Sequence, residues 1–131
     1  ASIANAIAKI SFRTRKSIID SEKLWKVLED NILEAAKTKA LDYRVCTQIL
    51  WAFAKVNRKS TQLFRLMENQ VLRNIDTINS QGMANTVWAY ARLGHSSPKL
   101  FDVISHKAME KLDDFSSQAI ANTVWAYAKV G

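Results

Sequence analysis

The sequence is poor in the residues that interrupt secondary structure. It contains three glycines and one proline among 131 residues. Small β-sandwiches and barrels need a turn roughly every 8–12 residues, and such turns favour Gly, Pro, Asn or Asp. The shortage of these residues argues against an all-β fold and fits a chain made of several helices.

The sequence also lacks the side chains that several kinds of site require. One cysteine excludes an internal disulfide, and with only two histidines it leaves no set of zinc ligands. There is no Gly-rich phosphate loop, HExxH or CxxC motif. We therefore expect no enzyme, no cofactor and no small-molecule substrate. The longest uncharged run, residues 77–91, is too short and too polar to span a membrane.

Acidic residues are outnumbered. The chain has 19 basic and 12 acidic residues, a net charge of +7, within a composition of 48% hydrophobic residues that is typical of a soluble globular domain. The cations Arg13, Arg15 and Lys16 all precede the first acid, Asp20. Such an excess suits a polyanionic partner, most often a nucleic acid.

What the sequence does contain is a repeat. Residues 83–94 read Met-Ala-Asn-Thr-Val-Trp-Ala-Tyr-Ala-Arg-Leu-Gly, and residues 120–131 read Ile-Ala-Asn-Thr-Val-Trp-Ala-Tyr-Ala-Lys-Val-Gly. The offset is 37 residues, and a weaker copy lies a further 37 residues back, at 46–57. A second segment precedes each copy, at 24–28, 63–67 and 100–104. Repetition at a fixed period of this size is the signature of stacked repeats.

Both segments of the repeat have the periodicity of helices. In 63–75 the apolar residues fall at 63, 64, 66, 67, 71, 72 and 75, which forms one helical stripe. N-cap residue types recur at Asp42, Asn79 and Ser116. Residues that tolerate a left-handed turn follow each second helix, at Asn57, Gly94 and Gly131. Pro98 suits the first position of a helix.

These signals predict an all-α fold, an α-solenoid of stacked two-helix repeats. The first helices are expected at about 22–37, 60–74 and 98–112, and the second helices at about 43–56, 80–93 and 117–130. The expected organisation is a part-helix at 1–10, an inserted loop around 11–21, and repeats at 21–57, 58–94 and 95–131. Neither end has the polar face of a capping repeat. We therefore expect a slice of a longer array, or partners that cover both ends.

The second helix of each repeat carries a recurring polar set. At roughly 100° per residue, an amide, an aromatic ring and a cation fall on one side of it. The sets are Arg44, Gln48, Trp51 and Lys55; Gln81, Asn85, Trp88 and Arg92; and Gln118, Asn122, Trp125 and Lys129. Cations that meet phosphates, amides that read base edges and rings that stack on bases are features of single-stranded RNA binding. The predicted RNA-binding residues are these cations and amides together with Arg13, Arg15, Lys16, Arg58 and Lys59.

Each of these residues also has a structural interpretation. Lys55, Arg92 and Lys129 lie in the last helical turn, where the helix dipole favours a cation by about 0.3–1 kcal/mol. The three tryptophans can belong to the core, and the asparagines can bind the backbone of a neighbouring loop. Cys46 falls on an apolar position and is expected to be a small core residue. The cluster Arg13, Arg15 and Lys16 can be part of a solvated loop. His95, in a turn beside Arg92, could contact phosphate, but a plain surface histidine is expected.

The strings at 84–94 and 121–131 resemble the octotricopeptide repeats of algal organelles. The 37-residue period is more similar to the heptatricopeptide repeats of apicomplexan parasites and their relatives. The resemblance covers nearly the whole chain and is strongest in the second and third repeats. The proline-rich opening of the algal repeat and the RAP domain that often ends such proteins are both missing.

The resemblance implies an organellar RNA-binding solenoid located in the mitochondrion or, alternatively, in the plastid. Its RNA would be single-stranded or ribosomal. The role would be either that of an rRNA-holding component of a mitochondrial ribosome, with ribosomal proteins as partners, or that of an RNA processing or stability factor. The alternative is a protein-binding scaffold, against which the periodic cations count. The sequence does not decide which helix carries the binding face, because the cations Lys26, Arg65, Lys99 and Lys107 lie on the first helices and could form it instead.

Overall fold

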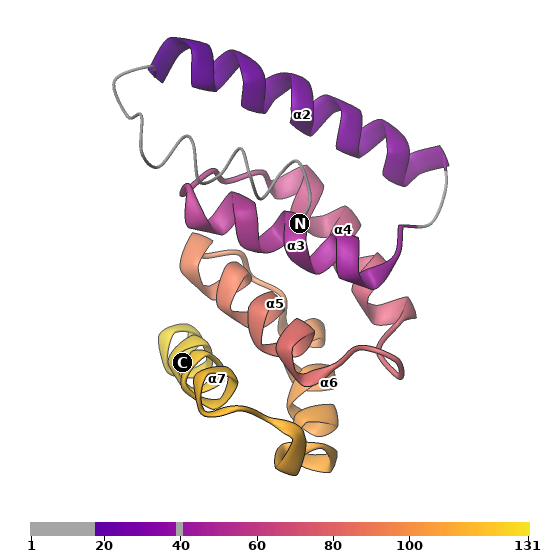
Figure 1. The fold of residues 1–131 in the computed structure, drawn as a ribbon, viewed down its shortest axis with the longest axis vertical. Helices are drawn as coiled ribbons and strands as arrows, with labels where there is room; N and C mark the ends of the chain where they lie inside the picture. Colours follow the sequence, from indigo (N-terminus) through magenta and orange to yellow (C-terminus); the bar gives the residue numbers. More distant parts are fainter. Residues whose placement is uncertain (1–17, 39–40) are drawn as a thin grey trace.

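The computed structural model describes the backbone of residues 18–38 and 41–131, with side chains from residue 22 onward. This part of the chain is helical throughout and has no strand, which confirms the all-α class (Figure 1). The helices are α2 (Ile18–Thr38), α3 (Tyr43–Lys55), α4 (Thr61–Arg73), α5 (Ser80–Leu93), α6 (Pro98–Glu110) and α7 (Ser117–Val130), with a 3₁₀ turn, η2 (Leu112–Asp114). The part-helix predicted at 1–10 lies outside the described residues.

The predicted helix ends are confirmed at most boundaries. The side chains of the three N-cap residues accept backbone N–H groups, Asp42 from Arg44, Asn79 from Gly82 and Ser116 from Ala119. Left-handed backbone follows the second helices, with φ of 59° at Asn57, 70° at Gly94 and 84° at Gly131. Pro98 is the first residue of α6. From α3 to α7, every boundary falls within two residues of its prediction.

The start of α2 was predicted wrongly. The helix begins at Ile18 instead of 22, so the predicted loop over 11–21 is helical in its last four residues. Ser21, although its residue type is common at N-caps, lies inside the helix. A serine inside a helix is only mildly unfavourable, however, and it does not end the helix when its neighbours continue it.

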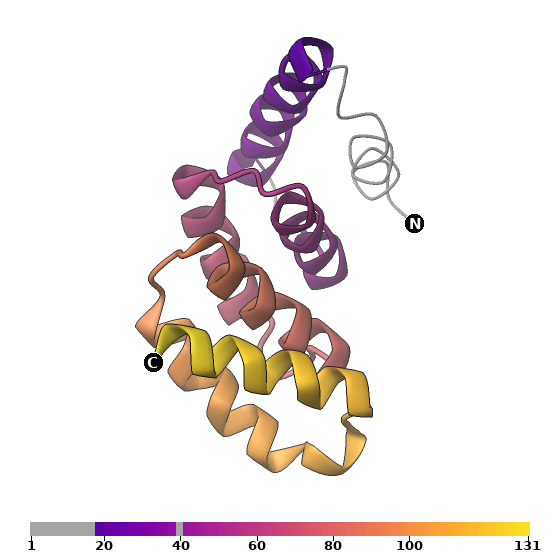
Figure 2. The same ribbon diagram turned by 90° about the vertical axis from the view of Figure 1, so that its left-hand side faces the viewer.

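The helices pack in two rows. α5 packs against both α3 and α7, while α4 packs against both α2 and α6 (Figures 1 and 2). Figure 1 shows the rows running from α2 at the top to α6 and α7 at the bottom. Because α5 has a neighbour on each side, its apolar positions are buried, including Met83 and Val87. The matching positions of α7, Ile120 and Val124, are 42% and 63% exposed.

Aromatic side chains join the two rows. The edge-to-face pairs are Trp25 with Phe53 at 5.0 Å between centroids, Phe64 with Tyr90 at 4.8 Å, and Phe101 with Tyr127 at 5.1 Å. The Tyr90 hydroxyl donates to the Phe64 carbonyl, and the Tyr127 hydroxyl donates to the Phe101 carbonyl at 2.6 Å. Burial raises the pKa of Tyr127 to about 12, so this donor keeps its proton. None of the described helices is both long enough and apolar enough to cross a membrane.

Candidate nucleic-acid interface

A cation lies over a tryptophan ring at the end of each of α3, α5 and α7. The distances to the ring centroid are 5.9 Å from Lys55 Nζ to Trp51, 5.5 Å from Arg92 Cζ to Trp88, and 5.8 Å from Lys129 Nζ to Trp125. All three fall within the limit of about 6 Å for a cation–π contact. The helical spacing of four residues brings each cation over its ring, since residues i and i+4 share a face.

The tryptophans lie at the boundary between core and solvent. Trp51 and Trp88 are half-buried against the hydrophobic core, and Trp125 is 41% exposed. The rings of Trp88 and Trp125 are 6.4 Å apart, which makes the cation–tryptophan pairs of α5 and α7 neighbours. The core alternative therefore holds in part for Trp51 and Trp88, whereas Trp125 is an exposed ring.

The predicted amides pair with one another along the helix. Gln81 Nε2 donates to Asn85 Oδ1 at 2.9 Å, and Gln118 Nε2 donates to Asn122 Oδ1 at 3.0 Å. Asn85 and Asn122 thus have side-chain partners in their own helices. On α3 the corresponding positions hold Arg44 and Gln48, both exposed. The guanidinium of Arg44 lies 5.3 Å from the ring centroid of Tyr43.

Arg92 also has a structural contact. Its Nε donates to the Ala54 carbonyl at 3.0 Å, which ties α5 to the last turn of α3. A cation at this place interacts favourably with the negative end of the helix dipole of α3. Arg92 can therefore interact with the dipole of α3 as well as with the dipole of its own helix, α5.

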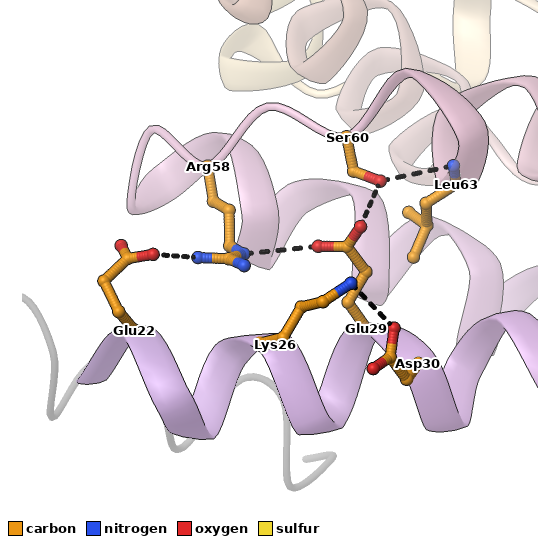
Figure 3. Close-up of polar contacts among 7 residues, drawn as sticks. All are labelled: Glu22, Lys26, Glu29, Asp30, Arg58, Ser60 and Leu63. Carbon is orange, nitrogen blue, oxygen red and sulfur yellow. Dashed lines mark hydrogen bonds and ion pairs between the residues drawn. The ribbon is translucent and has the colours of Figure 1, made fainter. Parts of the chain in front are cut away.

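Arg58 belongs to an ion-pair network inside the protein. Its Nη1 lies 2.9 Å from Glu22 Oε2, and its Nε lies 3.4 Å from Glu29 Oε1, both on α2 (Figure 3). The Ser60 hydroxyl donates to Glu29 Oε2 at 2.8 Å and accepts the Leu63 N–H at 3.3 Å. The arginine side chain is 17% exposed. Its charge is therefore largely compensated by α2, whereas Lys59 is exposed. The predicted cluster of Arg13, Arg15 and Lys16 lies outside the described residues.

His95 was predicted at the surface, and that prediction is wrong. The side chain is 8% exposed and stacks on Phe64, with ring centroids 4.1 Å apart and planes 18° apart. Gly94 turns the chain, and the His95 N–H donates to the Tyr90 carbonyl at 2.9 Å. Burial, with the nearby charge of Lys59, lowers the pKa of His95 to about 4. The signal in the sequence was its position, because the residue after a left-handed C′ glycine often packs back on the helix.

Two other predictions concern the core and metal ligands. Cys46 is fully buried, as predicted, and burial raises the pKa of its thiol to about 11. Thr86, within the repeated Ala-Asn-Thr string, is buried and donates to the Gly82 carbonyl at 2.7 Å, so this threonine has a structural role. Within the described ranges, no three His, Cys, Asp or Glu side chains come together in a group that could hold a metal ion.

The fold and this face define a class of protein, a basic all-helical chain with repeated cation–aromatic pairs. The family model of the RNA-editing substrate-binding complex 6 protein matches residues 3–131, and the chain belongs to this family. A search of curated proteins finds no match to the chain. The family match names neither the octotricopeptide nor the heptatricopeptide repeats, so that finer assignment stays a prediction.

Proposed function

We propose that the chain binds single-stranded RNA along α3, α5 and α7, as part of an RNA-editing substrate-binding complex. The observation that carries the proposal is the cation over a half-exposed tryptophan, which occurs three times on adjacent helices. Stacking of a base on an aromatic ring contributes about 1–3 kcal/mol per base and tolerates any sequence. The family membership supports the RNA partner.

In this proposal each helix end contacts about one nucleotide. The cation meets the phosphate, the exposed part of the tryptophan meets a base, and the neighbouring amides offer donors and acceptors to base edges. Three such units hold only a short stretch of RNA. A chain of this kind binds weakly alone, which fits a role within a complex whose other members add contacts.

The cellular setting follows from the family and the resemblance together. We propose a mitochondrial location and a binding role without catalysis by this chain. The description of the family names an RNA-editing complex. We therefore prefer that setting to the ribosome or the stability factor expected from the resemblance. We also propose that the two rows of helices form an α-solenoid with repeats at 21–57, 58–94 and 95–131.

The test is binding of labelled oligouridylate over a salt series. We expect the triple variant Lys55→Gln, Arg92→Gln, Lys129→Gln to lose about two units of the log–log salt slope, since each single-strand phosphate contact contributes about 0.7. The matched control is Lys23→Gln, Lys37→Gln, Arg73→Gln, which removes the same charge from exposed positions of α2 and α4. Circular dichroism of both variants checks that the helices remain.

The outcomes separate the hypotheses. Equal loss in both triple variants means that RNA responds only to net charge, which contradicts a defined face. If the α3–α5–α7 variant keeps the wild-type salt slope, RNA binds at another surface of the protein. No binding by the wild-type chain under any salt condition contradicts the proposal and favours the protein-scaffold alternative.

One observation favours a protein contact as a second candidate function. The side of α7 that matches the buried side of α5 exposes Ile120 and Val124. α3 and α5 each present such a side to the next helix of their row, so this surface of α7 continues an existing interface. The fitting partner is another helix with a small, apolar face.

A further inference from the structure

The turn after α5 has the same construction as the turn after α3. Each has a left-handed residue, Asn57 in one and Gly94 in the other. The next residue donates its N–H to a carbonyl in the last turn of the helix, Arg58 to Phe53 at 2.8 Å and His95 to Tyr90 at 2.9 Å. Two residues later comes a buried serine that precedes the next helix, Ser60 and Ser97. Arg58 and His95 therefore occupy equivalent places, 37 residues apart.

In the first of these turns, carboxylates from α2 meet the donors. Glu22 and Glu29 face the Arg58 guanidinium, and Ser60 donates to Glu29 (Figure 3). The donors of the turn after α3 thus surround negative charge, which the carboxylates of α2 supply.

In the second turn, α4 takes the place of α2. Trp25 of α2 and Phe64 of α4 make equivalent edge-to-face contacts with the helix in the other row. When these two residues are aligned, Thr61 takes the position of Glu22. The counterpart of Glu29 is Glu68, and this residue does not line the space beside the turn. A hydroxyl has therefore replaced one carboxylate, and the other lies outside the space.

A pocket of about 220 Å³ lies at this place. It is lined by two cations, Lys59 and Arg65, and by no acidic residue. The serine and threonine residues in the lining are Thr61, Ser96 and Ser97, and the hydroxyl of the lining residue Tyr90 already donates to the Phe64 carbonyl. A water molecule takes about 30 Å³ of liquid, so the volume holds several waters or a small ionic group. The composition of the lining favours a negative group.

One residue of the lining has a buried ring nitrogen without a partner. His95 lines it, is more than nine-tenths buried, and its Nε2 has no hydrogen-bond partner among the described residues. A buried polar atom of this kind is costly unless something binds it. In addition, Ser97 precedes α6 without a side-chain capping bond, so the positive end of the dipole of α6 is uncapped beside the pocket.

We propose that this pocket binds a phosphodiester group of single-stranded RNA, in the place that a carboxylate takes in the preceding turn. Lys59 and Arg65 supply the charge, and the hydroxyls and a ring N–H of His95 supply hydrogen bonds. The proposal rests on the proposed RNA-binding function and extends it, because it adds a site at α4 and the turn that precedes α6 to the face on α3, α5 and α7.

The first test is an NMR titration with dimethyl phosphate, which carries the phosphodiester without base or sugar. A bound anion close to the ring favours the imidazolium, so we expect the pKa of His95 to rise by about one unit or more. His106, which is exposed on α6, is the internal control and should not respond. An unchanged His95 resonance overturns the proposal. A response to inorganic phosphate alone also overturns it and indicates a phosphomonoester, such as a phosphorylated peptide.

The second test uses variants of the full chain. Thr61→Glu restores the carboxylate of the first turn, and we expect it to abolish the response of His95 to dimethyl phosphate. Arg65→Gln should lower the salt slope of oligouridylate binding by about 0.7, while Arg73→Gln, also exposed on α4, should leave it unchanged. Equal slopes in the two arginine variants contradict the site.

These results also separate the pocket from the wider function. If the α3–α5–α7 variant loses RNA affinity and Arg65→Gln does not, the RNA face stands and the pocket proposal fails. If dimethyl phosphate shifts His95 but the wild-type chain does not bind oligouridylate, the RNA function fails, and with it the assignment of the pocket to RNA.

Discussion

At the scale of the residue, His95 makes the stability of the protein depend on pH. Its folded-state pKa of about 4 lies below the ordinary value of 6.5, so protonation favours the unfolded chain. The free energy of unfolding that depends on His95 should be highest above pH 6.5 and should fall as the pH drops toward 4. Below pH 4 this residue should cause no further change. At about 1.4 kcal/mol per pKa unit, the loss is about 1–3 kcal/mol. Urea unfolding at pH 7.5 and pH 4.5 measures it.

The two histidines provide a matched control for this prediction. His95→Gln should remove most of the difference in unfolding free energy between the two pH values, whereas His106→Gln should keep it. Asp76 does not interfere, because its hydrogen bond with Lys107 lowers its pKa below the ordinary 3.8, outside this window. Identical pH dependence in His95→Gln and the wild-type chain would contradict the assignment.

The same residue shows where sequence reasoning stops. Cys46 was placed correctly because it falls on an apolar position of a helical period, and the period fixes the face. His95 lies just beyond a helix, where burial depends on the direction of the turn and on the approach of α4. The spacing of Lys55 and Trp51 was likewise predictable from the helix, while the bond from Arg92 to Ala54 depends on how α3 packs against α5.

At the scale of the element, the N-cap of α5 makes a measurable contribution to the free energy of unfolding. Asn79 Oδ1 accepts the Gly82 N–H at 2.7 Å, which satisfies one of the unpaired donors of the first turn. We expect Asn79→Ala to lower the free energy of unfolding by about 0.5–2 kcal/mol in urea denaturation. Asn79→Asp keeps an acceptor at the same place and should stay close to the wild-type value. Equal losses in both variants would show that the cap bond is not the cause.

The helices differ in how well the sequence predicted them. α5 and α7 were predicted with the correct ends because each begins after a capping side chain and ends before a left-handed glycine. The first turn of α2 was missed, although Ser17, an N-cap residue type, directly precedes Ile18 in the sequence. Local chemistry thus predicts a helix best where the signals at both of its ends agree. Elsewhere the length of a helix depends on its neighbours.

At the scale of the whole molecule, α7 has an apolar side that the other described helices leave uncovered. We expect the chain to associate at high concentration through Ile120 and Val124, in sedimentation velocity runs over a range of concentrations. Val124→Lys should keep the protein monomeric with unchanged helicity, because this side chain is 63% exposed already. Met109→Lys, on α6 and 68% exposed, is the control and should behave as the wild-type chain does. A wild-type chain that is monomeric throughout contradicts the prediction.

The tyrosine hydroxyls that join the two rows have a mechanical consequence. Tyr90 and Tyr127 fasten α5 to α4 and α7 to α6 at one carbonyl each, so these helices resist sliding along their axes. The matching position on α3 is Phe53, which packs on Trp25 and has no hydroxyl to fasten it. The rows are therefore fastened in different ways along the molecule. At α5 and α7 a tyrosine hydroxyl holds them together, whereas next to α3 the ion pairs of Arg58 with α2 do so.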